Sequence, residues 1–132
     1  MKVVFDTNVL VSALVFPGGR AEEALRCIIE ERDSLVLSKP ILDELLGALA
    51  RKFSRDAEEL AHAAVFLTSL AEMATPTRRI RALEDEADNR ILECAVAGGA
   101  DAIVTGDRGV LELGQFRSIR LLTLRAYLDR SA

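Results

Sequence analysis

Short aliphatic runs suited to β-strands alternate along this chain with longer segments of helical periodicity. The strand-like runs are residues 2–5, 35–37, 102–105 and 117–123. Helical stripes or helix-boundary signals mark residues 21–33, 38–53, 60–71, 85–98 and 124–130, whereas residues 9–16 fit no single pattern. Such alternation is typical of a parallel sheet covered by helices. We therefore predict a three-layer α/β/α sandwich with a central, mostly parallel sheet.

Composition limits the size, interior and location of this fold. The 132 residues suit a single domain, 1–132, with an aliphatic core, because half of them are apolar but only 5% are aromatic. The net charge of -4 argues against a chain that is basic overall, although a local basic patch remains compatible with it. Cys27 and Cys94 form no disulfide framework, and Asp6 and Asn8 interrupt the apolar start. We expect a cytoplasmic protein without a membrane segment.

Acidic residues stand where two strand-like runs end. Asp6 follows residues 3–5, and Asp107 follows residues 103–105 after a single glycine. Because the carboxyl ends of parallel strands share one edge of a sheet, these distant acids can meet there. Two carboxylates about 4 Å apart repel by roughly 4 kcal/mol at an effective dielectric near 20. Acids gathered at this edge therefore favour a bound divalent cation.

Three further acids lie in the predicted helices. Asp88 shares a helical face with apolar residues 91, 92 and 95 and is expected to point toward the sheet. Asp85 stands at a helix N-cap position, and an exposed role in solubility would explain Glu44. Simple capping would likewise explain Asp6 or Asn8, and a plain turn would explain Asp107. The residues alone leave these alternatives open.

Other catalytic chemistries lack their residues. His62 is the single histidine and is predicted to lie on the surface, which excludes His-based triads and His-rich zinc sites. Neither cysteine belongs to a C-x-x-C motif, and no phosphate-binding loop of the G-x-x-x-x-G-K-[ST] type occurs. An all-oxygen site remains, and such a site suits Mg²⁺ or Mn²⁺.

Four short motifs occur in an order that resembles the PIN-domain ribonucleases. They are Asp6-Thr7-Asn8-Val9-Leu10, Glu44 within residues 40–45, Asp88-Asn89 before residues 91–95, and Ile103-Val104-Thr105-Gly106-Asp107. The chain is most similar to the VapC-like proteins, the toxin components of bacterial and archaeal toxin–antitoxin pairs. The resemblance implies a PIN-like fold and a metal-dependent endoribonuclease that hydrolyses RNA. It also implies a cognate antitoxin and a homodimer.

The resemblance assigns roles position by position. The catalytic acids fall on Asp6, Glu44, Asp88 and Asp107, of which Asp6, Asp88 and Asp107 would bind Mg²⁺ or Mn²⁺. Thr105 takes the place of the polar helper, and Asn8 would assist through water. The segment before Asp88 departs from the proline and extra acid of related sequences, so Asp85 could support or replace it.

Arginines near the presumed site would contact RNA phosphates. The candidates are Arg78, Arg79, Arg81, Arg90 and Arg108. A solvated charged surface explains them equally well.

Three other functions share some of these sequence features. A phospho-receiver domain needs adjacent acids after its first strand, but Thr7 follows Asp6. A haloacid dehalogenase-type phosphatase needs a second aspartate where Asn8 stands. A catalytically silent PIN-like binding module remains open.

Overall fold

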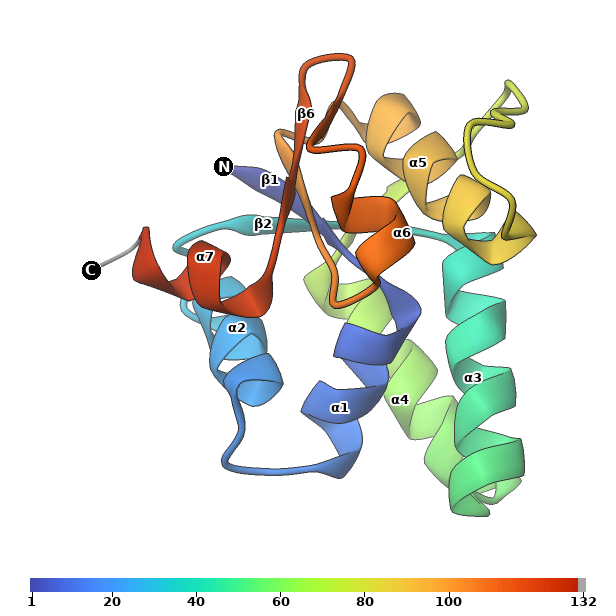
Figure 1. Cartoon of the computed structure of the whole chain (residues 1–132). Coiled ribbons are helices and arrows are strands. Elements are labelled where there is room, and N and C mark those ends of the chain that lie inside the picture. The colour runs from blue at the N-terminus through green and yellow to red at the C-terminus, as the bar shows by residue number, and fades with distance from the viewer. Residues whose placement is uncertain (131–132) are drawn as a thin grey trace.

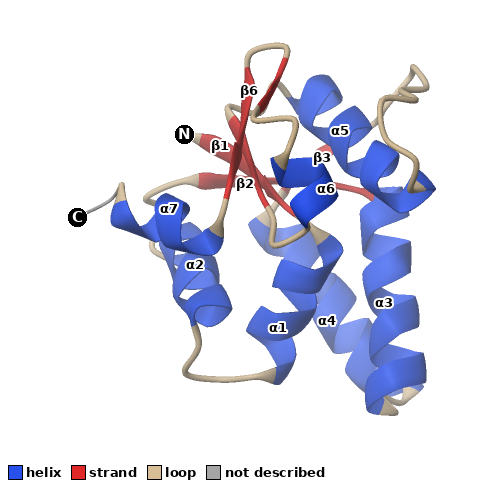
Figure 2. Ribbon diagram, viewed as in Figure 1, coloured by secondary structure: helices blue, strands red, loops and turns tan. Residues whose placement is uncertain are grey.

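A six-stranded sheet runs through the middle of the structure, a computed structural model that describes residues 1–130 (Figures 1 and 2). The last two positions of the predicted 1–132 domain lie outside the described residues. The strand order is β3-β2-β1-β4-β6-β5, and every neighbouring pair is parallel except β5 with β6. The strands are β1 (Lys2–Phe5), β2 (Ser34–Ser38), β3 (Glu72–Ala74), β4 (Ala102–Val104), β5 (Gln115–Phe116) and β6 (Ile119–Leu122).

Helices cover both faces of the sheet, which confirms the predicted three-layer α/β/α arrangement. They are α1 (Thr7–Val15), α2 (Arg20–Ile29), α3 (Lys39–Phe53), α4 (Ala57–Leu70), α5 (Glu86–Gly98), α6 (Arg108–Leu111) and α7 (Leu124–Asp129). Helices α1, α2 and α7 lie on one side, α5 lies on the other, and the α3–α4 pair extends beside α1 (Figure 1). Within residues 1–130, none of these helices has the length and apolarity needed to cross a bilayer.

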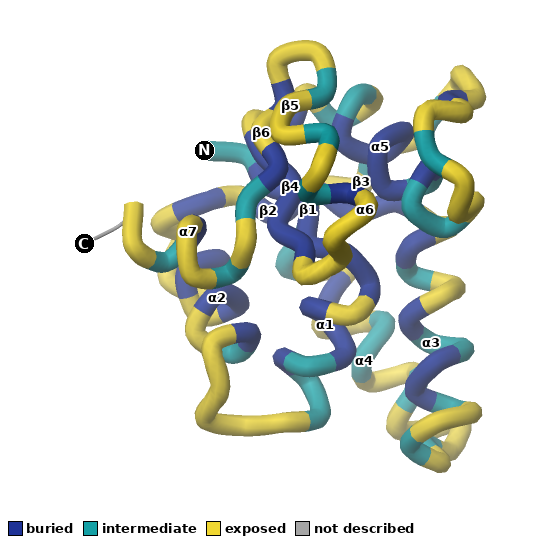
Figure 3. Tube along the Cα trace, in the orientation of Figure 1, coloured by how far each residue is buried: buried dark blue, intermediate teal, exposed yellow. Residues whose placement is uncertain are grey.

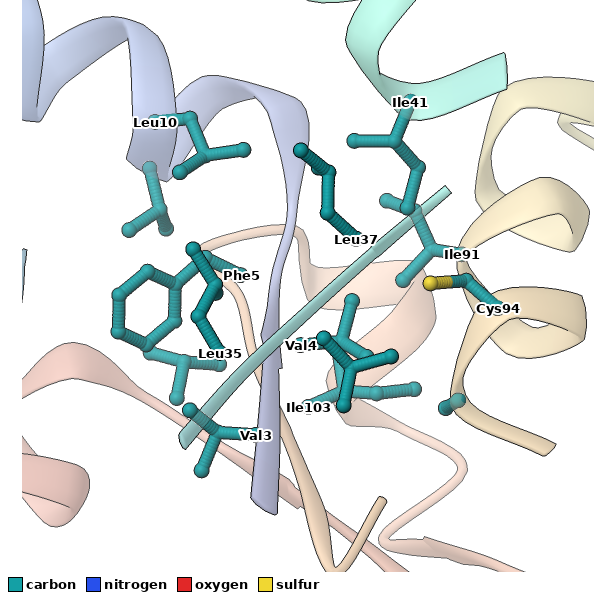
Figure 4. Close-up of a cluster of buried hydrophobic side chains, with 14 of the residues drawn as sticks. Val3, Val4, Phe5, Leu10, Leu35, Leu37, Ile41, Ile91, Cys94 and Ile103 are labelled. Atoms are coloured by element: carbon teal, nitrogen blue, oxygen red, sulfur yellow. The ribbon is translucent and has the colours of Figure 1, made fainter. Parts of the chain in front are cut away.

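The core follows the two-residue alternation of the central strands. Val3 and Phe5 point to the side of α1 and α7, whereas Val4 and Ile103 point to α5 (Figure 4). Phe5 meets Tyr127 of α7 edge-to-face, with ring centroids 5.7 Å apart. Buried residues occupy the centre of the molecule, and exposed residues lie mainly in loops and on the outer faces of helices (Figure 3). A sheet buried on both faces supplies a rigid platform for side chains at its edge.

The structure corrects several predicted boundaries. Residues 9–15, which fit no single sequence pattern, belong to α1, and Phe16 caps its end. The helix predicted to reach residue 71 ends at Leu70, and residues 72–74 form the edge strand β3. The last strand begins at Ile119 because Arg117 takes a left-handed backbone conformation (φ 55°) in a tight hairpin with β5. Ser38 occupies the predicted N-cap position of α3, but its hydroxyl makes no capping hydrogen bond. Three-residue strands and hairpins carry too few residues to show a period.

Gly98 lets α5 approach the sheet closely. A Cβ atom at Gly98 would lie 2.3 Å from Cγ1 of Val36 in β2. We expect Gly98→Ala to lower the free energy of unfolding by about 1–3 kcal/mol in urea denaturation, because a buried strand must move. Gly47→Ala in α3 is the matched control, since its Cβ would meet only the flexible end of Arg51. The control should be neutral or gain up to about 1 kcal/mol of helix propensity, so equal losses would contradict this packing.

Candidate functional site

Strand pairing brings Asp6 and Thr105 side by side. Phe5 of β1 pairs with Val104 of β4, and the Asp6 amide donates to the Val104 carbonyl at 3.1 Å. The buried Thr105 hydroxyl donates to Oδ2 of Asp6 and accepts the Asp107 amide at 3.0 Å. Thr105 therefore fixes both acids relative to each other at the carboxyl edge of the sheet.

Three of the predicted acids also cap helices. Asp6 accepts an N–H from the first turn of α1 at 2.9 Å, and Asp107 accepts one from α6 at 3.1 Å. Asp85 caps α5 with a bond of 2.8 Å. The capping that the sequence left open for Asp6 and Asp85 is therefore present, and Asp107, for which a plain turn was the alternative, also caps a helix. Capping is compatible with a functional site, because each capped helix has its N-terminus, and with it the capping carboxylate, at the carboxyl edge of the sheet.

Glu44 of α3 and Asp88 of α5 approach this edge from the side. Burial and, in decreasing order, the negative charges of Asp107, Asp85, Asp6 and Glu44 together raise the pKa of Asp88 to about 6. Partial burial of its carboxyl group also raises the pKa of Glu44, although the residue as a whole is exposed, and the charges of Asp85 and Asp6 add to this rise. Carboxylates that shift one another in this way share one electrostatic environment. The structure thus brings five acids from four distant segments near one edge of the sheet, and we name Asp6, Glu44, Asp85, Asp88 and Asp107 the acidic edge.

The donor set suits a hard divalent cation, but the side chains are not gathered around one. Within residues 1–130, no three His, Cys, Asp or Glu side chains form a group that could hold a metal ion in their present positions. Burial raises the pKa of Asp6, while hydrogen bonds from Thr105 and Val9 oppose this rise. An ion would have to draw the half-buried Asp88 and the exposed Glu44 toward Asp6. Its charge would relieve their repulsion.

Thr7 is a polar residue that the sequence analysis did not select. Its side chain is buried next to the acidic edge, and its hydroxyl has no hydrogen-bond partner within the described chain. The same hydroxyl lies close enough to Glu44 to lower the pKa of that carboxyl. A buried hydroxyl without a partner is rare unless water or an ion completes it. The signal in the sequence was its position directly after a strand-ending acid.

The remaining candidate residues lie around this edge, and they differ in exposure and in whether other residues already pair with their charges. Asn8 is exposed in the first turn of α1, and Arg108 is exposed directly after Asp107. Arg78, Arg79 and Arg81 are exposed on the loop between β3 and α5, and His62 is exposed on α4 as predicted. Arg90 differs from them, since its guanidinium lies 2.8 Å from buried Glu93 and 3.2 Å from Glu86. Its charge is therefore already neutralised by the protein.

The sequence itself matches a known family. Residues 2–109 match the family model described as PIN domain. The chain belongs to the PIN-domain family. An uncharacterized protein of Methanocaldococcus jannaschii, MJ1680, is 31% identical to this PIN domain over 117 residues. That match covers 86% of this chain and 75% of the archaeal protein.

Solved structures share the PIN fold seen here. One is the crystal structure of VapBC2 from Rickettsia felis bound to a DNA fragment from its promoter. A chain of that structure aligns with this protein with a TM-score of 0.63 and 17% identity. This match covers 93% of the present chain and 98% of that chain. Mycobacterium tuberculosis VapC20, described as a Sarcin-Ricin loop cleaving toxin, aligns with a TM-score of 0.63 and 16% identity over 89% and 98% of the two chains. At these identities the likeness shows a common fold.

Repulsion at the acidic edge predicts that the PIN domain without metal gains stability when Asp88 loses its charge. Because the folded pKa of Asp88 is raised to about 6, its contribution to stability is full below the ordinary value near 3.8 and is lost as the pH rises through 6. We expect Asp88→Asn to melt at a higher temperature than the wild type at pH 7.5 in EDTA. The difference should vanish near pH 4.

The control is Asp43→Asn, which removes an exposed carboxylate from α3. Its pair with Lys39 is solvated, so the melting temperature should change little at either pH. A lower melting temperature for Asp88→Asn at pH 7.5 would show that its charge is stabilising and would contradict the repulsion.

Proposed function

We propose that this PIN domain, residues 1–132, is a metal-dependent endoribonuclease that hydrolyses RNA phosphodiester bonds with Mg²⁺ or Mn²⁺. One observation carries the proposal. Five carboxylates from four separate segments lie near the carboxyl edge of a parallel sheet, where burial and their charges raise the pKa of Asp88 to about 6. A protein that keeps such mutual repulsion gains from a cation at that place.

Each residue of the acidic edge has a separate role in this proposal. Asp6, Asp88 and Asp107 would bind the ion, and Glu44 would bind it through water or orient the attacking water. Thr105 positions Asp6 through its hydroxyl. Asn8 and Asp85 support the site from the first turns of α1 and α5. A bound divalent ion would lower the pKa of water and offset the charge that develops on the phosphate.

The biological setting extends this proposal. Similar folds occur in VapBC structures, and one neighbour is described as a toxin that cleaves the Sarcin-Ricin loop. These neighbours support a role as the RNA-cleaving toxin of a toxin–antitoxin pair. The proposed partners are a cognate antitoxin and a second copy of the chain. Two free, buried cysteines are compatible with the reducing cytoplasm in which we place the protein.

Metal titration followed by thermal melting tests the proposal. An ion that binds only the folded protein stabilises it by about 2.7 kcal/mol at 100 times its dissociation constant. We expect Mn²⁺ to raise the melting temperature at pH 7.5 and to do so less at pH 5, where Asp88 is largely protonated. The same protein should cleave single-stranded RNA with Mn²⁺ and stop when EDTA is added.

A silent binding module is the second candidate, and one observation favours it. In residues 1–130 the acids are not gathered as a ligand set, and three of them serve as helix caps. This candidate predicts neither a shift in melting temperature with millimolar Mn²⁺ nor RNA cleavage. Both results together would overturn the nuclease.

A further inference from the structure

Two adjoining hollows lie beside α5 and share one wall. The first has a volume of about 430 Å³ and reaches Lys39 at the start of α3, and the second has about 450 Å³ and reaches Arg117 at the β5–β6 turn. Residues 76–79, which include Arg78 and Arg79, line both hollows. Together they form what we call the basic trough, defined by Lys39, Arg78, Arg79 and Arg117.

The basic trough carries positive charge that the protein leaves largely uncompensated. Arg78, Arg79 and Arg117 form no ion pair with any residue in 1–130, and Lys39 pairs only with the exposed Asp43 at 2.8 Å. Glu93 is the one carboxylate among the lining residues that the structure describes. Its oxygens are already used, since they pair with the Arg90 guanidinium and accept an amide hydrogen bond. A chain with a net charge of -4 thus concentrates free cations in one place.

Two buried polar side chains fix the loop that carries these arginines. Glu93, which is 5% exposed, accepts the Ile80 amide at 2.8 Å. Asn89, which has no exposed surface, accepts the Leu83 amide at 2.9 Å and donates to the Leu83 carbonyl at 2.8 Å. A loop anchored at both points presents its arginines without a large ordering cost on binding.

The basic trough and the acidic edge share their supporting helices. Helix α3 carries Lys39 and, five residues later, Glu44, which corresponds to a rise of about 7.5 Å. On α5, Asp88 is offset by roughly 140° around the helix axis from Glu93, which lines both hollows, so a distance of the order of the helix diameter, about 10–12 Å, separates Asp88 from the trough. A stacked strand advances about 3.4 Å per nucleotide, so it would cross this distance in about three nucleotides.

We propose that the basic trough binds backbone phosphates of the RNA substrate about three nucleotides from the bond that is cleaved. This inference rests on the proposed function and adds a substrate-binding surface to it. The planar guanidinium groups of Arg78 and Arg79 can donate two hydrogen bonds to a phosphate or stack on a base. Pro40 and Pro76 add apolar lining against which an unpaired base can pack. These features favour a nucleic-acid strand over an acidic polypeptide.

RNA binding without cleavage tests the trough separately from catalysis. The probe is a fluorescein-labelled single-stranded RNA of mixed sequence, titrated with protein in EDTA at several salt concentrations. The test variant is Arg78→Gln/Arg79→Gln, whose positions are exposed and do not support the fold. The matched control is Arg20→Gln/Arg26→Gln, which removes two exposed arginines from α2.

We expect the test variant to bind RNA at least 10-fold more weakly, on the order of 1.4 kcal/mol. Its slope of log affinity against log salt should fall in magnitude by about 1.4, at about 0.7 for each lost phosphate contact. The control should keep the wild-type affinity and slope. RNA affinity in the test variant equal to that of the wild type would overturn the proposal that the trough binds RNA. A wild type that binds no RNA at low salt would overturn it as well.

Two further results separate this inference from its alternatives. Binding of poly-aspartate that depends on Arg78 and Arg79, together with unchanged RNA binding, assigns the trough to an acidic partner and overturns the inference. If the wild type cleaves RNA with Mn²⁺ and the test variant keeps the same KM, the proposal for the trough is wrong and the proposed nuclease function is retained. If RNA binding depends on both arginines but no cleavage occurs, the RNA-binding role of the trough is retained and the proposed nuclease function is wrong.

Discussion

Asp6→Asn is expected to reduce metal-dependent RNA cleavage by at least about 100-fold while leaving the protein folded. Loss of a residue that only supports a metal ligand already costs about 10–100-fold, so loss of a direct ligand should cost more. Asparagine keeps an oxygen that can accept the α1 cap, so helix α1 should form as before. What it loses is the negative charge at the centre of the acidic edge. Initial cleavage rates with Mn²⁺ measure the effect.

Asp43→Asn is the matched control for this variant. Asp43 lies next to Glu44 in the sequence, but its carboxylate is exposed and pairs with Lys39. Its replacement should leave the cleavage rate within a factor of about two, as is usual for a surface pair worth under 1 kcal/mol. Full activity of Asp6→Asn, with circular dichroism equal to that of the wild type, would remove Asp6 from the mechanism.

Asp33→Asn should cause the largest loss of stability of the variants considered. Its carboxylate is almost fully buried and meets the Met1 ammonium group at 2.7 Å, the Tyr127 hydroxyl at 2.7 Å and the Arg130 guanidinium. Removing one partner of a buried ion pair typically costs 3–5 kcal/mol, because the remaining charges stay unpaired. Since asparagine can still accept the Tyr127 hydroxyl, we expect a loss of about 3 kcal/mol by urea denaturation at pH 7.

The pH dependence gives this prediction a second readout. Burial opposes ionisation of Asp33, but the bonds from the Met1 ammonium and Tyr127 and the charge of Arg130 outweigh it and lower its pKa. The stability that this group contributes is therefore present above its ordinary pKa near 3.8 and is lost as the pH falls through its lower folded value. The gap between wild type and variant should be full at pH 7 and should shrink below about pH 4.

Asp129→Asn is the control for Asp33→Asn. Its pair with Arg125 is 3.7 Å long, and both side chains are 74% exposed. The free energy of unfolding should change by no more than about 0.5 kcal/mol. A loss at Asp33 no larger than that at Asp129 would show that the buried cluster contributes little.

Much of the acidic edge was predictable because its geometry follows from strand order. Residues 2–5 and 102–105 read as buried strands, and the acids that follow them had to reach the same edge once the strands were parallel. Asp88 followed from its position on the apolar face of α5. These inferences needed only the period of each element and the direction of the strands.

Other parts depend on tertiary partners that a local pattern does not contain. Arg90 was a candidate for contacting RNA phosphates, but Glu93, three residues later on α5, neutralises it and anchors the loop at Ile80. A polar residue on a helix can be exposed or buried against a loop, and only the path of that loop decides between them. The edge strand β3 was missed for a similar reason, since its three residues gain their extended form by pairing with β2.

The bond from Thr105 to Asp6 has a consequence for protein synthesis. The two residues are 99 positions apart, so Asp6 at the end of β1 is held in place only after β4 and Thr105 have been synthesised and have paired with β1. A nascent chain emerging from the ribosome would therefore carry an incomplete site until more than three quarters of it had been made. If this protein cuts RNA, its site would be complete only after Thr105 has been synthesised, which limits cleavage of the message and the ribosome that produce the chain.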